Sequence, residues 1–165
     1  MKTLYNKSFL IVAFFTLLSS ISTAQISKAE IIATGLTCSM CSNAIFKQLQ
    51  SLPDAANVAT DLNTNTFTVT LKNGSTLTPS AFKASVEKAG FFIGSLVLTV
   101  DAKTVQKSPY ILLKGASNNQ KEVQIQVLDK GYVTDKEFKK LSKSLKNIVT
   151  FNTSNEDDFH IKIVN

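Results

Sequence analysis

The sequence predicts an α+β protein, and three observations carry this prediction. Apolar and polar residues alternate over Thr66–Leu71, as expected of a strand with one buried face. Two other segments, Ser42–Leu52 and Pro79–Ala89, place apolar residues at helical spacing instead. Short strand patterns flank these helices, which gives the order β-α-β-β-α-β between Ala29 and Leu98. This order is typical of a ferredoxin-like βαββαβ sandwich, with both helices on one face of a four-stranded antiparallel sheet.

The first half of this unit begins with a short apolar strand, Ile31–Ala33, which ends at Gly35. The helix that follows is expected to bury one face and to end before Pro53, because proline cannot continue a helix. That face contains Ala44, Ile45, Leu49 and Leu52. A strand at Asn57–Leu62, a turn at Asn63–Asn65 and the strand at Thr66–Leu71 complete this half.

The second half begins after a turn at Asn73-Gly74. Thr78 and Pro79 are a favourable N-cap and first-turn pair for the second helix, and Gly90 ends it. This helix is expected to bury Phe82, Val86 and Ala89, and the fourth strand is expected at Phe92–Thr99.

The remaining residues predict a linker and a small C-terminal α+β domain. Residues 101–108 are polar and read as the linker, which makes 25–100 the first domain and 109–165 the second. Strands are expected at Tyr110–Lys114, Glu122–Leu128, Ile148–Phe151 and Phe159–Val164. Thr134, with Glu137 three positions later, forms a capping box that begins the helix of this domain. The order of its predicted elements partly repeats that of the first unit. Nothing in its residues indicates its role.

The first 24 residues have the pattern of a signal peptide. Lys2 and Lys7 precede an apolar segment, Phe9–Leu18, and Ser22-Thr23-Ala24 is a small-residue cleavage site. A segment of ten residues is too short to span a bilayer comfortably, so an uncleaved anchor is the less favoured interpretation. The sequence therefore predicts an exported protein, periplasmic or secreted, that begins at Gln25 and has no membrane insertion after cleavage.

The composition argues against a dedicated nucleic-acid binder. All 18 basic residues are lysines, and none is the arginine that base and phosphate recognition favours. Loss of the two signal lysines leaves 16 lysines against 12 acidic residues, a net charge of about +4. Weak affinity for anionic surfaces is compatible with this charge.

The two cysteines, Cys38 and Cys41, stand one helical turn apart where the first strand pattern becomes helical. They can hold a metal, exchange electrons or close a disulfide. A disulfide over so short a loop stabilises little, which makes a structural bridge the weakest interpretation. A helix N-terminus lowers a thiol pKa below its usual value of about 8.5 and favours thiolate, a soft donor that selects soft ions such as Cu(I). A structural zinc site needs four ligands, and the only histidine, His160, is far away in the sequence.

The segment Gly35-Leu36-Thr37-Cys38-Ser39-Met40-Cys41 resembles the Gly-Met-Thr-Cys-x-x-Cys signature of heavy-metal-associated domains. These occur in copper chaperones, in N-terminal modules of copper-transporting ATPases and in periplasmic mercury-binding proteins. Asp61 near the end of the second strand and Lys88-Ala89-Gly90-Phe91 also fit the family. The resemblance covers about residues 28–100.

The resemblance implies a function and assigns site residues. Cys38 and Cys41 match the metal ligands of the family, and Phe91 matches an aromatic residue that shields the site from water. The expected cargo is Cu(I), with Hg(II) or another thiophilic ion as the alternative. The expected partners are a metal-transporting ATPase or another metal donor or acceptor, and no enzymatic activity is expected. Leu36 replaces the usual methionine, a mild change at a packing position.

Other interpretations stay open on the sequence alone. A thiol–disulfide oxidoreductase also uses Cys-x-x-Cys at a helix start, although Thr37 stands where such enzymes usually have an aromatic residue. A non-catalytic interaction module with oxidised thiols is a further alternative. Met40 is interpreted as an exposed loop residue in preference to a third sulfur ligand. His160 is interpreted as a solvated strand residue in preference to a metal ligand.

Overall fold

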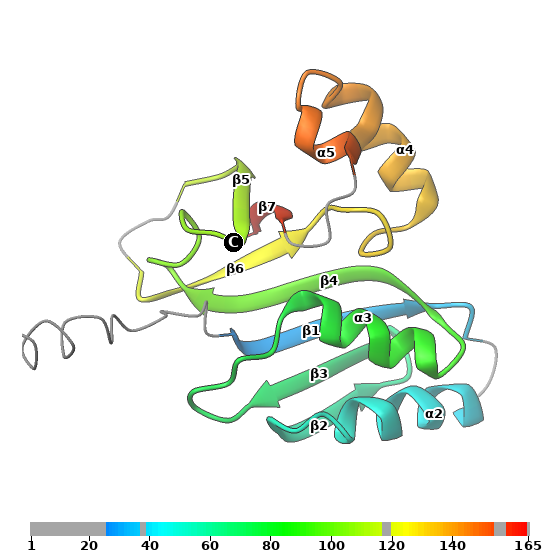
Figure 1. Ribbon diagram of the computed structural model, residues 1–165. Helices are drawn as coiled ribbons and strands as arrows, with labels where there is room; N and C mark the ends of the chain where they lie inside the picture. Colours follow the sequence, from blue (N-terminus) through cyan, green and yellow to red (C-terminus); the bar gives the residue numbers. More distant parts are fainter. Residues whose placement is uncertain (1–25, 37–38, 117–119, 154–157, 165) are drawn as a thin grey trace, which may run out of the picture.

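The computed structural model describes residues 26–36, 39–116, 120–153 and 158–164 (Figure 1). The signal peptide expected at residues 1–24 lies outside this part. The first unit consists of β1 (Ile26–Thr34), α2 (Ser39–Gln50), β2 (Ala55–Asp61), β3 (Thr66–Leu71), α3 (Pro79–Lys88) and β4 (Phe92–Asp101). The second consists of β5 (Tyr110–Lys114), β6 (Glu122–Val127), α4 (Asp135–Ser144), α5 (Val149–Thr153) and β7 (Phe159–Val164).

The first unit has the predicted ferredoxin-like βαββαβ order. Its strands are antiparallel and lie in the order β2-β3-β1-β4, while α2 and α3 cover one face of them (Figure 1). Side chains of both helices and of the sheet meet in the main core, where the fully buried residues include Ile45, Leu49, Phe67, Phe82 and Val86. The first strand is longer than the sequence predicts, because it begins at Ile26.

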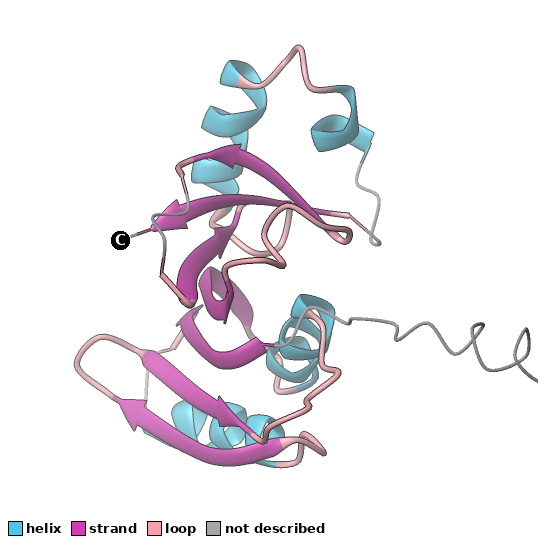
Figure 2. Ribbon diagram, turned by 90° about the vertical axis from the view of Figure 1, so that its left-hand side faces the viewer, coloured by secondary structure: helices cyan, strands magenta, loops and turns pink. Residues whose placement is uncertain are grey.

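The seven strands in the described part of the chain form one sheet, in the order β2-β3-β1-β4-β6-β7-β5 (Figures 1 and 2). β6 pairs antiparallel with β4, so the second unit continues the sheet of the first. β7 then pairs antiparallel with β6 and parallel with β5.

The segment expected to be a linker, residues 101–108, is a series of turns that takes part in the main core. Val105 is fully buried there, and Thr104 is 8% exposed. Asp101 belongs to β4 and pairs with Glu122 of β6. The two predicted domains therefore share one sheet and one core in the structure.

The strand predicted at Ile148–Phe151 is wrong, because these residues lead into a short helix, α5. Phe151 is 1% exposed, and its ring lies 5.4 Å from that of Phe138 on α4. A helical turn places Ile148 and Phe151 on the same side, so both pack into a second apolar cluster. This packing overrides the strand preference of the β-branched residues here. The order is β-β-α-α-β, which does not repeat the first unit.

The second cluster holds α4 and α5 against the sheet. Its buried members are Leu128, Val133 and Phe151, and three partly buried residues pack against them: Phe138 and Leu141 of α4, and Leu145 at its C-cap. Thr134 accepts a hydrogen bond from the Glu137 backbone N–H, which is one half of the predicted capping box. Among the described residues, no helix has the length and apolar character to cross a membrane.

Candidate metal centre

The sequence places the cysteine pair between β1 and α2, and the structure describes one of the two. Thr37 and Cys38 lie outside the described residues. Cys41 is the third residue of α2 and is half-buried. The first turn of α2 contains no acidic side chain, and Lys47 lies in its last turn. The positive end of the helix dipole at Cys41 is therefore not offset by a neighbouring carboxylate of the same turn.

The chain leaves β1 through a conformation that favours glycine. Gly35 has φ +86°, in the left-handed region that residues with a Cβ rarely adopt. A Cβ at this position would lie 3.9 Å from Cδ1 of Phe91. The Phe91 ring therefore lies beside Gly35, the first residue of the Gly-Leu-Thr-Cys-x-x-Cys segment, and its shielding role stays a prediction. Both Phe91 and Leu36 are half-buried and pack against the main core.

Buried residues on α2 fix Cys41 relative to the sheet. Ile45 and Leu49 are fully buried, and they lie one and two helical turns after Cys41. Met40, in contrast, is 81% exposed. The prediction that Met40 is exposed is confirmed, although the residue lies in the first turn of α2 and not in a loop.

Asp61 stabilises a turn at the same end of the sheet. Its Oδ1 accepts a hydrogen bond from the Asn63 backbone N–H at 2.9 Å, and its Oδ2 accepts one from the Thr64 hydroxyl at 2.9 Å. The bond from Asn63, followed by that from Thr64, lowers the pKa of the Asp61 carboxyl. The backbone N–H of Ala33 donates to the Asn65 carbonyl at 3.2 Å, which joins this turn to the end of β1. Asp61 therefore supports the strand end from which the cysteine segment starts.

Part of this chain is similar in sequence to domains of solved structure. A yeast copper transporter domain, studied in apo and Cu(I)-loaded states, is 33% identical; the match covers 39% of this chain and 86% of that domain, with a TM-score of 0.35. The N-terminal domain of a potential copper-translocating P-type ATPase from Bacillus subtilis, in its Cu(I)-loaded state, is also 33% identical; the match covers 41% and 82%, with a TM-score of 0.36. Residues 30–92 match the heavy-metal-associated domain model. The chain belongs to this family. No curated protein matches it.

Cys41 thus lies in the first helix of a heavy-metal-associated domain, and the family match ends near the start of β4. The described residues contain no cluster of three or more His, Cys, Asp or Glu side chains able to hold a metal ion. Among these described residues, no second group of side chains is therefore a candidate metal site. The candidate ligands are the two cysteines that the sequence predicts, Cys38 and Cys41.

His160, on β7 outside the heavy-metal-associated domain, is not the solvated residue that the sequence predicts. It is 1% exposed, because α5 covers this face of the sheet with Phe151, whose ring lies 5.2 Å from the imidazole. Its Nδ1 lies 2.7 Å from Oδ1 of Asp129, and its Nε2 lies 2.9 Å from Oγ1 of Thr150. The alternation of Phe159–Ile163 places His160 and Lys162 on the same face of β7. It gives no sign that α5 covers the His160 end of this face.

Asp129 is the residue of this group that sequence reasoning missed. Its Oδ2 accepts the His160 backbone N–H at 2.7 Å, so one carboxyl group holds both the main chain and the ring of the histidine. Burial raises the pKa of the Asp129 carboxyl, and the bonds from His160 offset part of that rise. With both ring nitrogens in hydrogen bonds to oxygen, His160 is a satisfied buried residue and not an available metal ligand.

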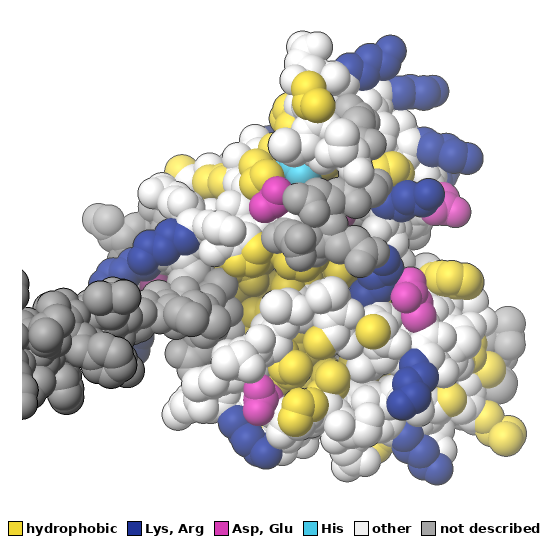
Figure 3. All heavy atoms as spheres, in the orientation of Figure 1, with side chains coloured by type: hydrophobic (Ala, Val, Ile, Leu, Met, Phe, Trp, Pro, Cys, Tyr) yellow, Lys and Arg dark blue, Asp and Glu magenta, His cyan; other side chains and the backbone are white. Residues whose placement is uncertain are grey.

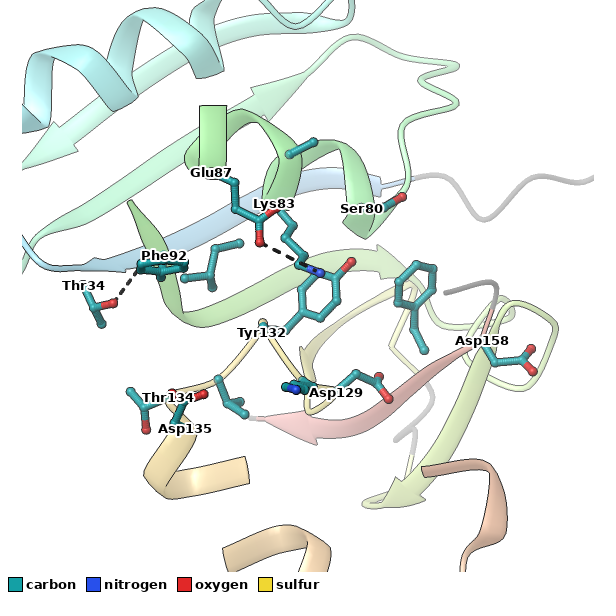
Figure 4. Close-up of a pocket in the computed structure, with 16 residues that line it drawn as sticks. Thr34, Ser80, Lys83, Glu87, Phe92, Asp129, Tyr132, Thr134, Asp135 and Asp158 are labelled. Atoms are coloured by element: carbon teal, nitrogen blue, oxygen red, sulfur yellow. Dashed lines mark hydrogen bonds and ion pairs between the residues drawn. The ribbon is translucent and has the colours of Figure 1, made fainter. Parts of the chain in front are cut away.

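A hollow of about 840 Å³ lies between α3 and the segment that joins β6 to α4 (Figure 4). Lys83 projects into it, 5.5 Å from the centre of the Tyr132 ring and 4.0 Å from the Glu87 carboxylate. Thr34, the last residue of β1, lies at one end (Figure 4). Cys41 is not among the described residues that line this hollow.

Proposed function

We propose that this protein is an exported soft-metal-binding protein, a Cu(I) chaperone or scavenger that binds one ion through the thiolates of Cys38 and Cys41. The observation that carries the proposal is the position of Cys41 in the first turn of α2 within a heavy-metal-associated domain. The Thr-Cys-x-x-Cys spacing leads us to expect the sulfur of Cys38 close to that of Cys41, and similar solved domains are described in Cu(I)-loaded states.

The chemistry of the site favours a soft ion with low coordination. Two thiolates satisfy a near-linear soft ion such as Cu(I), whereas a structural zinc site requires four ligands. The helix N-terminus at Cys41 stabilises the deprotonated sulfur. Hg(II) shares this preference for sulfur, so the same pair suits Hg(II) or another thiophilic ion as the alternative cargo.

An ion held by two sulfurs keeps open coordination, which allows a thiol of a partner to attack it. The ion then passes between proteins without release into water. The expected partner is a metal-transporting ATPase or another metal donor or acceptor that presents thiolates of its own. The N-terminal signal pattern places this exchange in the periplasm or outside the cell, and the protein needs no catalytic activity for it.

The proposal is tested by a competition for Cu(I). Anaerobically reduced protein that begins at Gln25 is titrated with Cu(I) in the presence of a chromogenic chelator. We expect one ion per chain to be withdrawn from the chelator, and we expect Cys38→Ser and Cys41→Ser each to abolish the competition. Ser75→Ala, which leaves both sulfurs in place, is the control and should bind Cu(I) as the natural protein does.

The same protein distinguishes the oxidoreductase alternative. Reduced protein is incubated with insulin. Insulin precipitates when its disulfides are reduced, so the turbidity of the sample reports the reaction. A protein that fails to compete for Cu(I) but reduces insulin would contradict the metal-binding proposal and support thiol–disulfide exchange. A protein that does neither would support a non-catalytic interaction module.

A further inference from the structure

The outer face of α4 carries a row of lysines that the heavy-metal-associated domain does not account for. Lys136, Lys139, Lys140 and Lys143 are all exposed, and we name them the α4 lysine face. At 3.6 residues per turn the four side chains lie within an arc of about 100° and span roughly 10 Å along the helix. Figure 3 shows lysine side chains standing in a column over this part of the molecule.

Packing on the opposite side of α4 keeps the α4 lysine face turned toward solvent. Phe138, Leu141 and Leu145 pack into the second apolar cluster, so the helix cannot turn its lysines away from solvent. Within the described residues, none of the four lysines forms an ion pair. The two acidic residues of α4, Asp135 and Glu137, lie on either side of the row at helical spacing and leave its centre positive.

We propose that the α4 lysine face docks the protein on a membrane surface rich in anionic phospholipid. Lysine is a compact point charge that suits a diffuse anionic surface, whereas arginine is preferred for the fixed geometry of nucleic-acid contacts. The chain contains no arginine at all. Because the apolar side of α4 already packs against the second apolar cluster, the docking is electrostatic, without insertion, and weakens with salt.

The position of α4 determines which other part of the molecule lies near the docked surface. Thr134, the residue before the helix, lies near Thr34, the last residue of β1: a Cβ on Gly94 would lie 3.7 Å from Cγ2 of Thr134 and 2.6 Å from Cγ2 of Thr34. The docking helix therefore begins beside the strand that leads to the cysteine pair. Docking itself needs no metal; its use in bringing cargo to a membrane transporter rests on the proposed function.

The test measures vesicle binding of metal-free protein that begins at Gln25. Binding to phosphatidylcholine vesicles is compared with binding to vesicles that also contain phosphatidylglycerol, by sedimentation at low and high salt. We expect binding only to the anionic vesicles and loss of this binding at high salt. Since each lysine near an anionic surface contributes about fivefold to the binding constant, the variant K136E/K139E/K140E/K143E should bind at least about tenfold more weakly.

A variant with the same change in net charge is the control. K47E/K88E/K103E/K107E reverses four exposed lysines outside α4 and should lose less than about threefold. Circular dichroism verifies that both variants are folded, and the four-fold Lys→Gln variant of the α4 lysine face replaces the first if it is not. Equal losses in the two variants, no preference for anionic vesicles, or tighter binding to a short DNA duplex than to the vesicles would each overturn the proposal.

Discussion

At the scale of single residues, Gly35 controls how the chain passes from β1 to the cysteine pair. Its φ of +86° is unfavourable for any residue with a Cβ, so Gly35→Ala should cost about 1–2 kcal/mol in the free energy of unfolding. We also expect a weaker competition for Cu(I), because the strain is relieved most easily by a shift of the segment that follows. Urea unfolding and the chelator titration measure the two effects.

Gly74→Ala is the matched control for this prediction. Gly74 has φ +82°, so an alanine there should be strained in its backbone as much as an alanine at Gly35. No atom lies within 4 Å of an added Cβ, and Gly74 lies in a turn between β3 and α3, away from the cysteine segment. It should lose similar stability and keep its affinity for Cu(I). Equal Cu(I) affinities in the two variants would contradict the role given to Gly35.

Asp61 should make the stability of the protein depend on pH in the acid range. The pKa of its carboxyl is lowered in the folded state by hydrogen bonds from Asn63 and Thr64. Its contribution is therefore present above the ordinary pKa of 3.8 and is lost as the pH falls through the lower folded value. In urea unfolding, Asp61→Asn should be less stable than the natural protein at neutral pH, and the difference should shrink below about pH 3.8. A difference that grows on acidification would contradict this assignment.

The group formed by Asp129, His160 and Thr150 joins the end of β6, β7 and α5, so its energetics belong to the scale of elements. Asp129→Ala removes the acceptor for both the His160 ring and its backbone N–H, which are buried, and should cost about 3 kcal/mol. Thr150→Val removes one bond to His160 from an exposed residue and should cost about 1 kcal/mol. Equal losses in the urea midpoints would show that the carboxyl group does not hold the histidine as described.

The two N-caps of α4 and α3 allow a second test at this scale. Thr134 accepts a hydrogen bond from Glu137, whereas Thr78 makes no side-chain cap bond. Thr134→Ala should therefore cost about 1 kcal/mol in the free energy of unfolding, and Thr78→Ala clearly less. Thermal unfolding of both variants measures the difference, and the reverse order would contradict the capping geometry.

The sequence predicts elements well where one local pattern decides them. The alternation at Thr66–Leu71 and the cap at Thr134 agree with the structure because each depends on neighbouring residues alone. The segment at Ile148–Phe151 does not, since its helix is stabilised by contacts with α4 and β7. The burial of His160 depends on the same contacts and was missed for the same reason. The candidate site stays a prediction from the spacing of Cys38 and Cys41, because the structure describes only Cys41 of this pair.

At the scale of the whole molecule, the sequence did not indicate that the two predicted domains share a sheet. Strand pairing between β4 and β6 joins residues far apart in the chain, and no local pattern specifies it. Val105, in the segment that reads as a linker, is fully buried in the main core. The polar composition around Val105 therefore conceals this connection between the two units.

The shared sheet and core predict cooperative unfolding. Because β6 continues the sheet at β4 and both units contribute to the main core, the protein should unfold in one transition, with equal calorimetric and van't Hoff enthalpies. Differential scanning calorimetry of protein that begins at Gln25 measures this directly. Two resolved transitions would show that the units fold independently.

The most direct measurement of the central claim is made on protein purified from its native compartment without oxygen. Metal analysis and a thiol count are carried out on the same sample. If Cys38 and Cys41 carry a soft ion, the sample contains about one equivalent of copper or another thiophilic metal per chain, and chelation of that metal exposes two titratable thiols. Metal-free protein whose two cysteines form a disulfide, and which takes up no Cu(I) after mild reduction, would contradict the account.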